Sequence, residues 1–417
     1  MCRLFTSSSD RAALSSGPLA LACRVILFAI PLAAVLAALD AVLWFTGDAL
    51  PASTVIKGQN LHTDAEVLYG RDFFSDQFAF YKRTGVIARR PRILLVGSSR
   101  VMQARSFMFA PLDPFFYNGG GMLGTASDVK DLAQMFLDGR LPKPDVLIAG
   151  IDPWWLKTSA QNNASLARRC EVCWNPVSHL TALRAMLRSP NVWAALWNGS
   201  VTPYEGQRGI GTRARTCGSG FRRDGSYQYT PSIIATNPFP PYEDRESPPV
   251  IERIRRCTHQ FSTPAVVDQN SALQIAEALF SLRVAGVEVY AFLPPFSSEA
   301  YGALEQSSEL RGWWHYYTRC FPSLMESQGI VVVPARRPCD IGLDDTYMVD
   351  GFHPSEVYMA HVIRDLVKNA PSGSLLKQID LGVLSSRIQR AYSPLAFDKP
   401  RLRSKPAAAV AATAGLQ

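Results

Sequence analysis

The sequence contains no motif typical of nucleic-acid-binding proteins, and it has few charged residues for its length. Charged side chains make up 19% of the 417 residues, and the basic excess, a formal net charge of +8, is scattered along the chain. Scattered basic residues without a binding motif argue against a nucleic-acid partner and favour contact with anionic surfaces or polymers. With 47% hydrophobic residues, the chain is not disordered and has material for one large domain or two modest ones.

Metal-binding patterns are absent as well. Cys170 and Cys173 have the C-x-x-C spacing, but no second pair follows at the spacing of a zinc site. Beyond the candidate site described below, the histidines have no partner pattern, and we expect His361, on the polar side of a predicted helix, at the surface. The sequence therefore predicts neither a metal site nor another cofactor.

Only one long apolar run is present, near the N-terminus. Residues Val25 to Phe45 carry a single charge, Asp40, and could cross the roughly 30 Å hydrocarbon core as a helix. Arginines precede the run and Asp48 follows it, so the positive-inside bias predicts a single-pass anchor in the cytoplasmic (inner) membrane, with the N-terminus inside and the rest periplasmic or otherwise extracytoplasmic. A cleaved signal peptide is the alternative, but the run exceeds the usual ~7 to 15 apolar residues. Asp40 either reaches the headgroups or pairs with a partner membrane protein.

Cysteines are frequent in the part of the chain that we expect outside the membrane. In an oxidising compartment they can form up to three disulfides, and proximity favours Cys320 with Cys339. The cysteines concerned are Cys170, Cys173, Cys217, Cys257, Cys320 and Cys339.

Strand and helix patterns alternate after the anchor. Amphipathic helix patterns, one of which begins with a capping box at Thr125 and one of which follows Pro354, separate short apolar runs that are typical of strands buried on both faces. We therefore predict an α/β fold, a three-layer sandwich in which helices cover both sides of a parallel sheet of about five strands. The apolar runs are residues 93–96, 145–151, 287–293 and 330–333.

Composition divides the chain into successive parts. The segment from about 156–262 is rich in Arg, Pro, Gly, Ser and Tyr and lacks sustained periodicity, so we interpret it as an insertion whose length indicates a function. The end of the chain is polar and then alanine-rich, which is typical of disorder. The predicted parts are a cytoplasmic N-terminus (1–24), a transmembrane anchor (25–45), a linker and lead-in (46–90), the α/β domain (91–370) and a disordered tail (371–417).

Polar residues follow the predicted strands, at the edge where open parallel sheets bind ligands. Ser99 comes directly after the first strand, at the start of a predicted helix, where backbone N–H groups can stabilise a developing oxyanion. Asp350 precedes His353 by three residues, so its carboxylate can hold the imidazole tautomer while the other ring nitrogen faces the serine. Alone, D-x-x-H is an ordinary loop pattern. Its place after a strand-terminal serine favours Ser99, Asp350 and His353 as a catalytic triad.

Two further segments at strand ends are candidates for substrate contact. Asn118 to Gly120 lets the backbone approach a ligand, so the Gly120 N–H is a candidate oxyanion donor, although a glycine run alone is more often a turn. Asp152, which only accepts hydrogen bonds when ionised, is a candidate for orienting a neighbour or binding a sugar hydroxyl. Trp154 and Trp155 either stack on a carbohydrate ring or fill the core.

These blocks resemble a known family in residue type and in order. Gly97 to Ser99 resembles the Gly-Asp-Ser nucleophile block of SGNH (GDSL-like) hydrolases, and Asp350 to His353 resembles their terminal D-x-x-H block. On this mapping, Asn118 to Gly120 resembles the block whose glycine joins the oxyanion hole. Two departures stand out, because Ser98 replaces the usual Asp and Asp152 stands where the family has Asn.

The resemblance implies a serine esterase or acyltransferase with an SGNH or flavodoxin-like fold over roughly residues 92–368, the insertion excepted. The departures resemble the divergent, membrane-tethered branch that includes envelope proteins of alginate O-acetylation and of lipoteichoic acid D-alanylation. Such relatives commonly work beside a multispanning membrane acyltransferase, so the expected substrate is an ester, above all an O-acetyl group, of a cell-envelope glycan. The alternatives are a catalytically inactive scaffold that binds polysaccharide or a membrane partner, and a lipid or peptidoglycan esterase.

Overall fold

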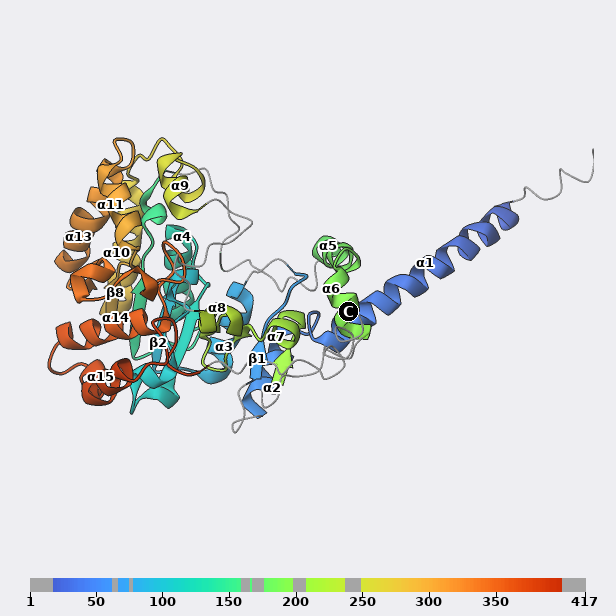
Figure 1. Ribbon diagram of the computed structural model, residues 1–417, viewed down its shortest axis with the longest axis horizontal. Helices are drawn as coiled ribbons and strands as arrows, with labels where there is room; N and C mark the ends of the chain where they lie inside the picture. The colour runs from blue at the N-terminus through green and yellow to red at the C-terminus, as the bar shows by residue number, and fades with distance from the viewer. Residues whose placement is uncertain are drawn as a thin grey trace, which may run out of the picture.

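A parallel five-stranded sheet forms the centre of the larger part of the molecule (Figure 1). The fold class is therefore α/β, as predicted. In spatial order the strands are β3 (Phe116–Gly120), β2 (Ile93–Gly97), β4 (Val146–Gly150), β8 (Glu288–Phe292) and β9 (Val331–Val333). The computed structural model describes residues 18–61, 67–74, 78–158, 166, 176–197, 208–236 and 249–399.

The position of β2 in the sheet explains where a ligand site is expected. Strand β2 pairs with β3 on one side and with β4 on the other, so the chain leaves β2 in one direction and returns on the opposite side. Ligands of such sheets bind at the carboxyl ends of the strands where the direction reverses. Ser99 and Asp152 come shortly after the ends of β2 and β4, at this point.

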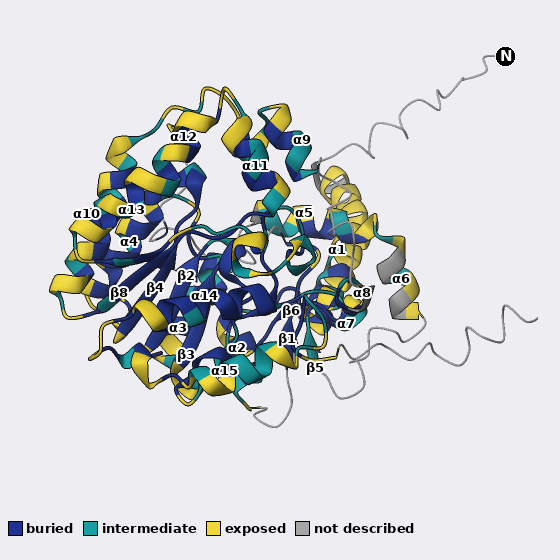
Figure 2. Cartoon of the chain, turned by 60° about the vertical axis from the view of Figure 1, so that its left-hand side comes forward, coloured by how far each residue is buried: buried dark blue, intermediate teal, exposed yellow. Residues whose placement is uncertain are grey.

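The strands of this sheet contribute side chains to two core clusters, which is why they are continuous apolar runs. Leu94 of β2 belongs to one core cluster with α4 (Ala126–Leu137) and α10 (Gln269–Val284), whereas its neighbour Ile93 belongs to a second cluster with α14 (Glu356–Asn369). Figure 2 shows the strands of this sheet as buried. The helices between β8 and β9 are α11 (Ser298–Gln306), α12 (Arg311–His315) and α13 (Phe321–Ser327), and α9 (Val250–Arg255) precedes α10.

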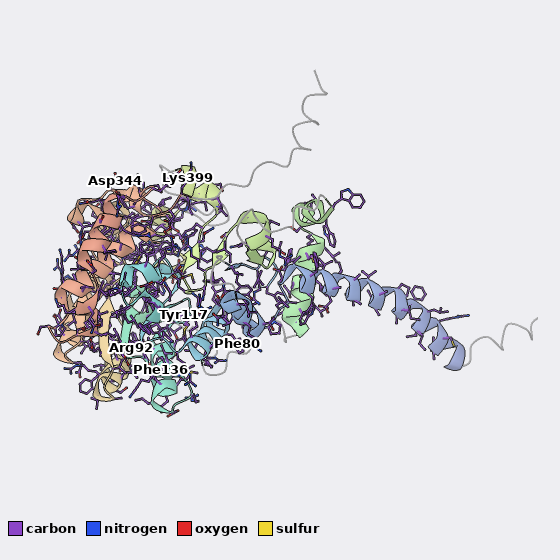
Figure 3. All side chains as sticks on the ribbon, turned by 90° about the horizontal axis from the view of Figure 1, so that it is seen from below. Phe80, Arg92, Tyr117, Phe136, Asp344 and Lys399 are labelled. Atoms are coloured by element: carbon purple, nitrogen blue, oxygen red, sulfur yellow. The ribbon has the colours of Figure 1, made fainter. Side chains whose placement is uncertain are left out.

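The N-terminal helix α1 (Pro18–Thr46) stands apart from this domain. Its stretch Leu21–Thr46 is long and apolar enough to cross a membrane. Most of its side chains are exposed, with Phe28 85% accessible, and Figure 3 shows that much of α1 has no neighbouring side chains from the rest of the molecule. The predicted apolar helix is therefore present. Its orientation in a membrane stays a prediction.

A second, smaller sheet lies between α1 and the α/β domain (Figure 1). We expected residues 46–90 to be a linker and lead-in, but Val67–Tyr69 of this range form a strand that pairs with two strands of the predicted insertion in this accessory sheet. Strands of two or three residues are too short to show an alternating pattern, which is why the sequence did not reveal them. The order is β5 (Arg208–Ile210), β1 (Val67–Tyr69), β6 (Gly220–Phe221) and β7 (Tyr227–Gln228), and the helices are α2 (Ala52–Leu61), α3 (Phe78–Arg89), α7 (Thr212–Cys217) and α8 (Pro231–Thr236).

The buried carboxylate of Asp48 fixes the end of α1 to the accessory sheet. It accepts hydrogen bonds from the Thr46 hydroxyl (2.7 Å), from the Thr212 N–H (2.8 Å) and from the Thr212 hydroxyl. Its other oxygen accepts the N–H of Asp72 (3.1 Å). Burial raises the pKa of Asp48, and these hydrogen bonds act in the opposite direction. The helix therefore runs directly into a folded unit, without a flexible linker.

Helix α5 (Pro176–Leu187), from the predicted insertion, packs against the C-terminal third of α1. Leu183 of α5 lies in one cluster with Leu39 of α1, and His179 Nε2 is 2.7 Å from Asp40 Oδ1. The single charge within the apolar run thus has a partner in its own chain, which neither of our two interpretations of Asp40 included. Helix α6 (Pro190–Trp197) follows α5.

Residues 371–399, predicted as the start of a disordered tail, are folded. Helix α15 (Leu381–Gln389) packs on α14, and both Leu384 and Phe397 are buried in the cluster around α14. The sequence did not predict this folded segment, because the segment buries isolated apolar residues and not a periodic stripe. Residues 400–417 lie outside the described part of the chain.

The disulfide predicted between Cys320 and Cys339 is wrong, because both thiols are free and exposed. Cys320 lies in the helical stretch between α12 and α13, and Cys339 lies in the turn after β9. Closeness in sequence does not bring their Cβ atoms to the roughly 3.8 Å that a disulfide needs. Cys217 and Cys257 are also free, and Cys170 and Cys173 lie outside the described residues.

His361 of α14, which we expected at the surface, is buried, and no described residue hydrogen-bonds either ring nitrogen. Burial, together with the nearby Arg364, lowers the pKa of His361 from an ordinary 6.5 to about 4. The unfolded chain therefore binds a proton more readily than the folded one. The neutral, buried His361 therefore contributes fully to the free energy of unfolding above pH 6.5. This contribution is lost as the pH falls from 6.5 towards 4.

We therefore expect His361→Leu to stabilise the protein more at pH 5 than at pH 8. The difference should be about 2 kcal/mol, since each pH unit in this window changes the unfolding free energy by about 1.4 kcal/mol. Urea denaturation at the two pH values measures it, and the exposed His315, replaced in the same way, is the matched control. Equal effects of His361→Leu at both pH values would contradict the assignment.

Candidate active site

Ser99, His353 and Asp350 meet at the carboxyl edge of the parallel sheet. Ser99 Oγ lies 2.9 Å from His353 Nε2, and His353 Nδ1 lies 2.6 Å from Asp350 Oδ2. Ser99 is exposed to solvent, whereas the next residue, Arg100, is completely buried. The structure thus brings together the three residues that the sequence suggested, in the hydroxyl, imidazole, carboxylate order of a catalytic triad.

The loop that carries Asp350 also orients its carboxylate. Asp350 Oδ1 accepts hydrogen bonds from the backbone N–H groups of Phe352 (2.9 Å) and His353 (2.6 Å). Burial opposes ionisation, but His353 and these hydrogen bonds outweigh it and lower the pKa of Asp350 below its ordinary value. An ionised Asp350 favours a proton on His353 Nδ1, which leaves Nε2 free to accept the proton of the serine hydroxyl.

The turn after β2 places Ser99 in the open. Ser99 begins a 3₁₀ turn (Ser99–Val101), and the Ser98 hydroxyl caps this turn by accepting the Arg100 N–H (3.2 Å). A Cβ atom on Gly97 would lie 2.9 Å from the Gly150 carbonyl oxygen, so only glycine allows β2 and β4 to approach this closely. Within the described chain, the Ser99 N–H has no acceptor, so it is an open donor beside its own Oγ.

A completely buried ion pair lies next to Ser99. Arg100 Nη1 is 3.0 Å from Asp152 Oδ1, and both side chains are inaccessible to solvent. The guanidinium also donates to the carbonyl oxygens of Phe352 (2.8 Å), Pro294 (2.9 Å) and Pro295. Arg100 therefore joins the ends of β2, β4 and β8 to the loop that carries the other triad residues.

Asp152 consequently orients Arg100. Orienting a neighbour is one of the two roles that the sequence suggested for Asp152. Its complete burial excludes direct contact with a sugar hydroxyl in this conformation. Burial raises the pKa of Asp152, and Arg100 acts in the opposite direction. Sequence reasoning missed Arg100, because arginine is rarely fully buried and nothing in the local pattern marks it as an exception.

The expectation that the Gly120 N–H is an open oxyanion donor is wrong. This N–H donates to Asn118 Oδ1 (2.7 Å), while Asn118 Nδ2 donates to the carbonyl oxygens of Val101 (2.9 Å) and Ala104 (2.8 Å). The buried Asn118 side chain thus braces the end of β3 against the turn after Ser99. A short polar side chain often captures a backbone N–H two residues on, which is the physical reason for the difference.

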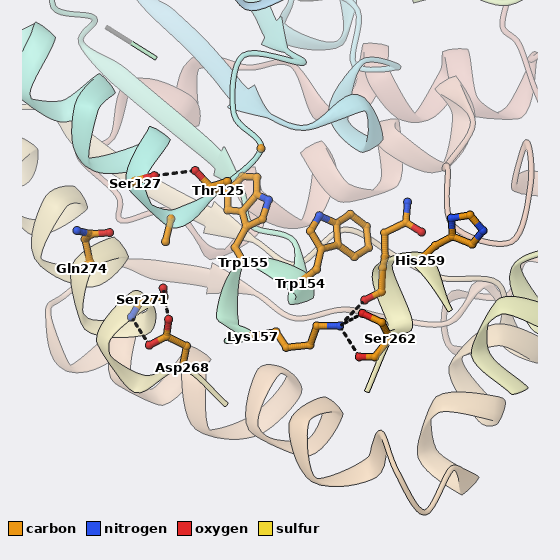
Figure 4. Close-up of a pocket in the computed structure, with 13 residues that line it drawn as sticks. Thr125, Ser127, Trp154, Trp155, Lys157, His259, Ser262, Asp268, Ser271 and Gln274 are labelled. Atoms are coloured by element: carbon orange, nitrogen blue, oxygen red, sulfur yellow. Dashed lines mark hydrogen bonds between the residues drawn. The ribbon is translucent and has the colours of Figure 1, made fainter. Parts of the chain in front are cut away.

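A pocket of about 440 Å³ opens at the same edge of the sheet (Figure 4). The half-buried Trp154 forms part of its wall, whereas Trp155 is only 3% exposed and belongs to the core. The Trp154 ring meets the Phe352 ring edge-on at 6.2 Å, and the Phe352 ring lies 4.3 Å from that of His353. One side chain therefore separates the pocket wall from the imidazole of the triad.

Among the residues that the structure describes, no group of three or more His, Cys, Asp or Glu side chains is placed to hold a metal ion. Comparison of the chain with protein-family models, with curated proteins and with solved structures finds no match.

Proposed function

We propose that the protein is a membrane-anchored serine esterase or acyltransferase of the SGNH type, with the flavodoxin-like strand order and three-layer architecture of that fold. The observation that carries the proposal is the array of Ser99 Oγ, His353 and Asp350, with contacts of 2.9 and 2.6 Å, at the reversal point of the sheet. A hydroxyl, an imidazole and a carboxylate in this order form the arrangement that activates a serine nucleophile.

The chemistry follows from these contacts. His353 Nε2 takes the proton of Ser99 Oγ as Oγ attacks the ester carbonyl, and Asp350 stabilises the imidazolium that forms. The oxyanion accepts a hydrogen bond from the Ser99 N–H, and the leaving alcohol takes the proton from His353. Water or a sugar hydroxyl then attacks the acyl-serine with His353 again as base, which gives hydrolysis or transfer and restores the free serine.

The surroundings suggest where the reaction takes place. We assign α1 as an inner-membrane anchor with the N-terminus in the cytoplasm, so that Ser99 acts outside this membrane. The expected substrate is an O-acetyl ester of a cell-envelope glycan, and the expected partner is a multispanning acyltransferase that supplies acyl groups.

One observation favours the catalytically inactive scaffold as a second candidate. The Gly120 N–H and the Asp152 side chain are both engaged, so the Ser99 N–H is the one donor identified for an oxyanion. One missing donor costs about 3 to 4 kcal/mol of barrier, or about 10² to 10³ in rate. Slow turnover is therefore expected even if the triad is active.

Labelling with a fluorophosphonate tests the proposal. The full-length protein in detergent micelles should form an adduct that peptide mass analysis places on Ser99, and Ser99→Ala should remove it. The exposed Ser323, replaced by alanine, is the control for handling and folding. Failure of Ser99 to form an adduct would favour the scaffold.

A second measurement separates the enzymatic alternatives once labelling is found. Release of acetate to water indicates an esterase, and its appearance on an added oligosaccharide indicates a transferase. Preference for long-chain over acetyl esters would favour a lipid esterase, and release of acetate from acetylated peptidoglycan would favour a peptidoglycan esterase.

A further inference from the structure

The pocket beside the triad is formed where three segments meet at the carboxyl edge of the sheet (Figure 4). Helices α4 and α10 both begin there and contribute side chains near their N-terminal ends, among them Ser127 and Gln274. The turn after β4 contributes Trp154, and the segment before α10 contributes Gln260. A volume of about 440 Å³ falls in the range of about 300 to 1,000 Å³ that small-molecule sites occupy.

The two formally charged side chains that line the pocket, Lys157 and Asp268, are opposite in sign, and both are hydrogen-bonded within the protein. Lys157 Nζ donates to the carbonyl oxygens of Gln260 (3.1 Å) and Ser262 (2.7 Å) and to the Ser262 hydroxyl (3.2 Å), which uses its three donors. Asp268 accepts the N–H (3.1 Å) and the hydroxyl (2.7 Å) of Ser271. An anionic ligand would therefore meet no free donor on Lys157, and the two side chains together give the pocket no net formal charge.

A carboxylate also lies at the N-terminus of α4. Asp128 Oδ2 accepts the backbone N–H groups of Gly124 (2.9 Å) and Thr125 (3.1 Å), and the Thr125 hydroxyl accepts that of Asp128 (3.2 Å). The negative charge of Asp128 offsets the positive end of the α4 dipole, so this helix start disfavours a phosphate or a uronate.

Uncharged polar groups, in contrast, remain open. Within the described chain, neither the Trp154 indole N–H nor the Gln274 side-chain amide has a hydrogen-bond partner. Two further groups are buried and unpaired, the Trp155 indole N–H and Gln260 Oε1, and the Trp155 side chain is only 3% exposed. In Figure 4 the nitrogen of each indole lies on the side that faces the other tryptophan. Unpaired buried polar groups cost roughly 1 to 3 kcal/mol each, so they favour an occupant that supplies partners.

We infer that this pocket binds a neutral sugar residue of the glycan whose ester reacts at Ser99, an inference that rests on the proposed function. The C–H face of a hexose or N-acetylhexosamine ring packs on the aromatic Trp154, and its hydroxyl groups both donate and accept, as the free indole and amide groups require. Trp154 contacts Phe352, which contacts His353, so the bound sugar lies next to the residue that carries the ester.

Oligosaccharide binding to the full-length Ser99→Ala protein, in a sugar-free detergent, tests this inference without turnover. The probes are tetramers of N-acetylglucosamine and mannose as neutral ligands and tetragalacturonate as the anionic one, measured by saturation-transfer NMR and calorimetry. We expect at least one neutral tetramer to bind and tetragalacturonate not to bind. Trp154→Ala and Gln274→Ala should each weaken binding at least tenfold, whereas Trp197→Ala, in the remote helix α6 and 91% exposed, should not.

Three results would overturn the inference: no binding of either neutral tetramer, equal or tighter binding of tetragalacturonate, or unchanged affinity in Gln274→Ala. The last variant removes only a surface amide, so its fold is preserved. Labelling of Ser99 in the wild type is a separate measurement. If Ser99 is labelled but no neutral sugar binds, only the pocket assignment is contradicted. If a sugar binds through Trp154 but Ser99 is not labelled, only the catalytic proposal is contradicted.

Discussion

The Asp350→Asn protein should react with a fluorophosphonate or with p-nitrophenyl acetate about 10³ to 10⁴ times more slowly than the wild type. In the wild type, Asp350 Oδ2 lies 2.6 Å from His353 Nδ1 and accepts a hydrogen bond from the Nδ1–H group. The amide that replaces the carboxylate can keep its oxygen on the backbone N–H groups of Phe352 and His353, and its NH₂ group then faces Nδ1. The ring proton moves to Nε2, which donates to Ser99 instead of accepting from it.

Unfolding by urea should show that this variant keeps its fold, because the two backbone hydrogen bonds to the loop are retained. Asp340→Asn is the matched control. Asp340 is also a carboxylate that bonds to a side chain three positions away, that of Arg337, but it lies outside the triad. A rate for Asp350→Asn within tenfold of the wild type would show that Asp350 does not set the tautomer of His353.

The triad could be predicted from the sequence because local geometry decides most of it. A serine after a glycine at the end of a buried strand is placed at the sheet edge by the turn itself, and a D-x-x-H sequence puts carboxylate and imidazole on one loop. The relation between these two segments, far apart in the chain, follows from the parallel strands between them, whose apolar runs are unambiguous.

Side-chain partners could not be predicted in the same way. Whether the Gly120 N–H is open depends on the rotamer of Asn118, and whether Asp152 faces a ligand depends on the position of Arg100, so neither follows from spacing. The accessory sheet was missed for a different reason. Its strands β1 and β5 come from segments far apart in the sequence, and each has three residues, so no periodicity marks them.

The second large effect is expected at Arg100. Arg100→Met should lower the free energy of unfolding by about 3 to 5 kcal/mol, because it leaves the buried carboxylate of Asp152 without its counter-charge. It should also slow the reaction at Ser99, since the carbonyl oxygen of Phe352 loses the donor that holds the loop of the triad. Urea denaturation and the rate of fluorophosphonate labelling measure the two effects.

The double variant Arg100→Met/Asp152→Leu separates these contributions. An apolar pair in place of a buried ion pair is often neutral or stabilising, and the aromatic ring of Phe296, 4.1 Å from the guanidinium carbon, provides an apolar surface for the new side chains. Stability should therefore return to within about 1 to 2 kcal/mol of the wild type. The labelling rate should remain low, because no side chain then donates to Phe352, Pro294 and Pro295. Recovery of both stability and rate would mean that Arg100 only neutralises Asp152, whereas recovery of stability alone identifies it as the residue that positions the Asp350–His353 loop against Ser99.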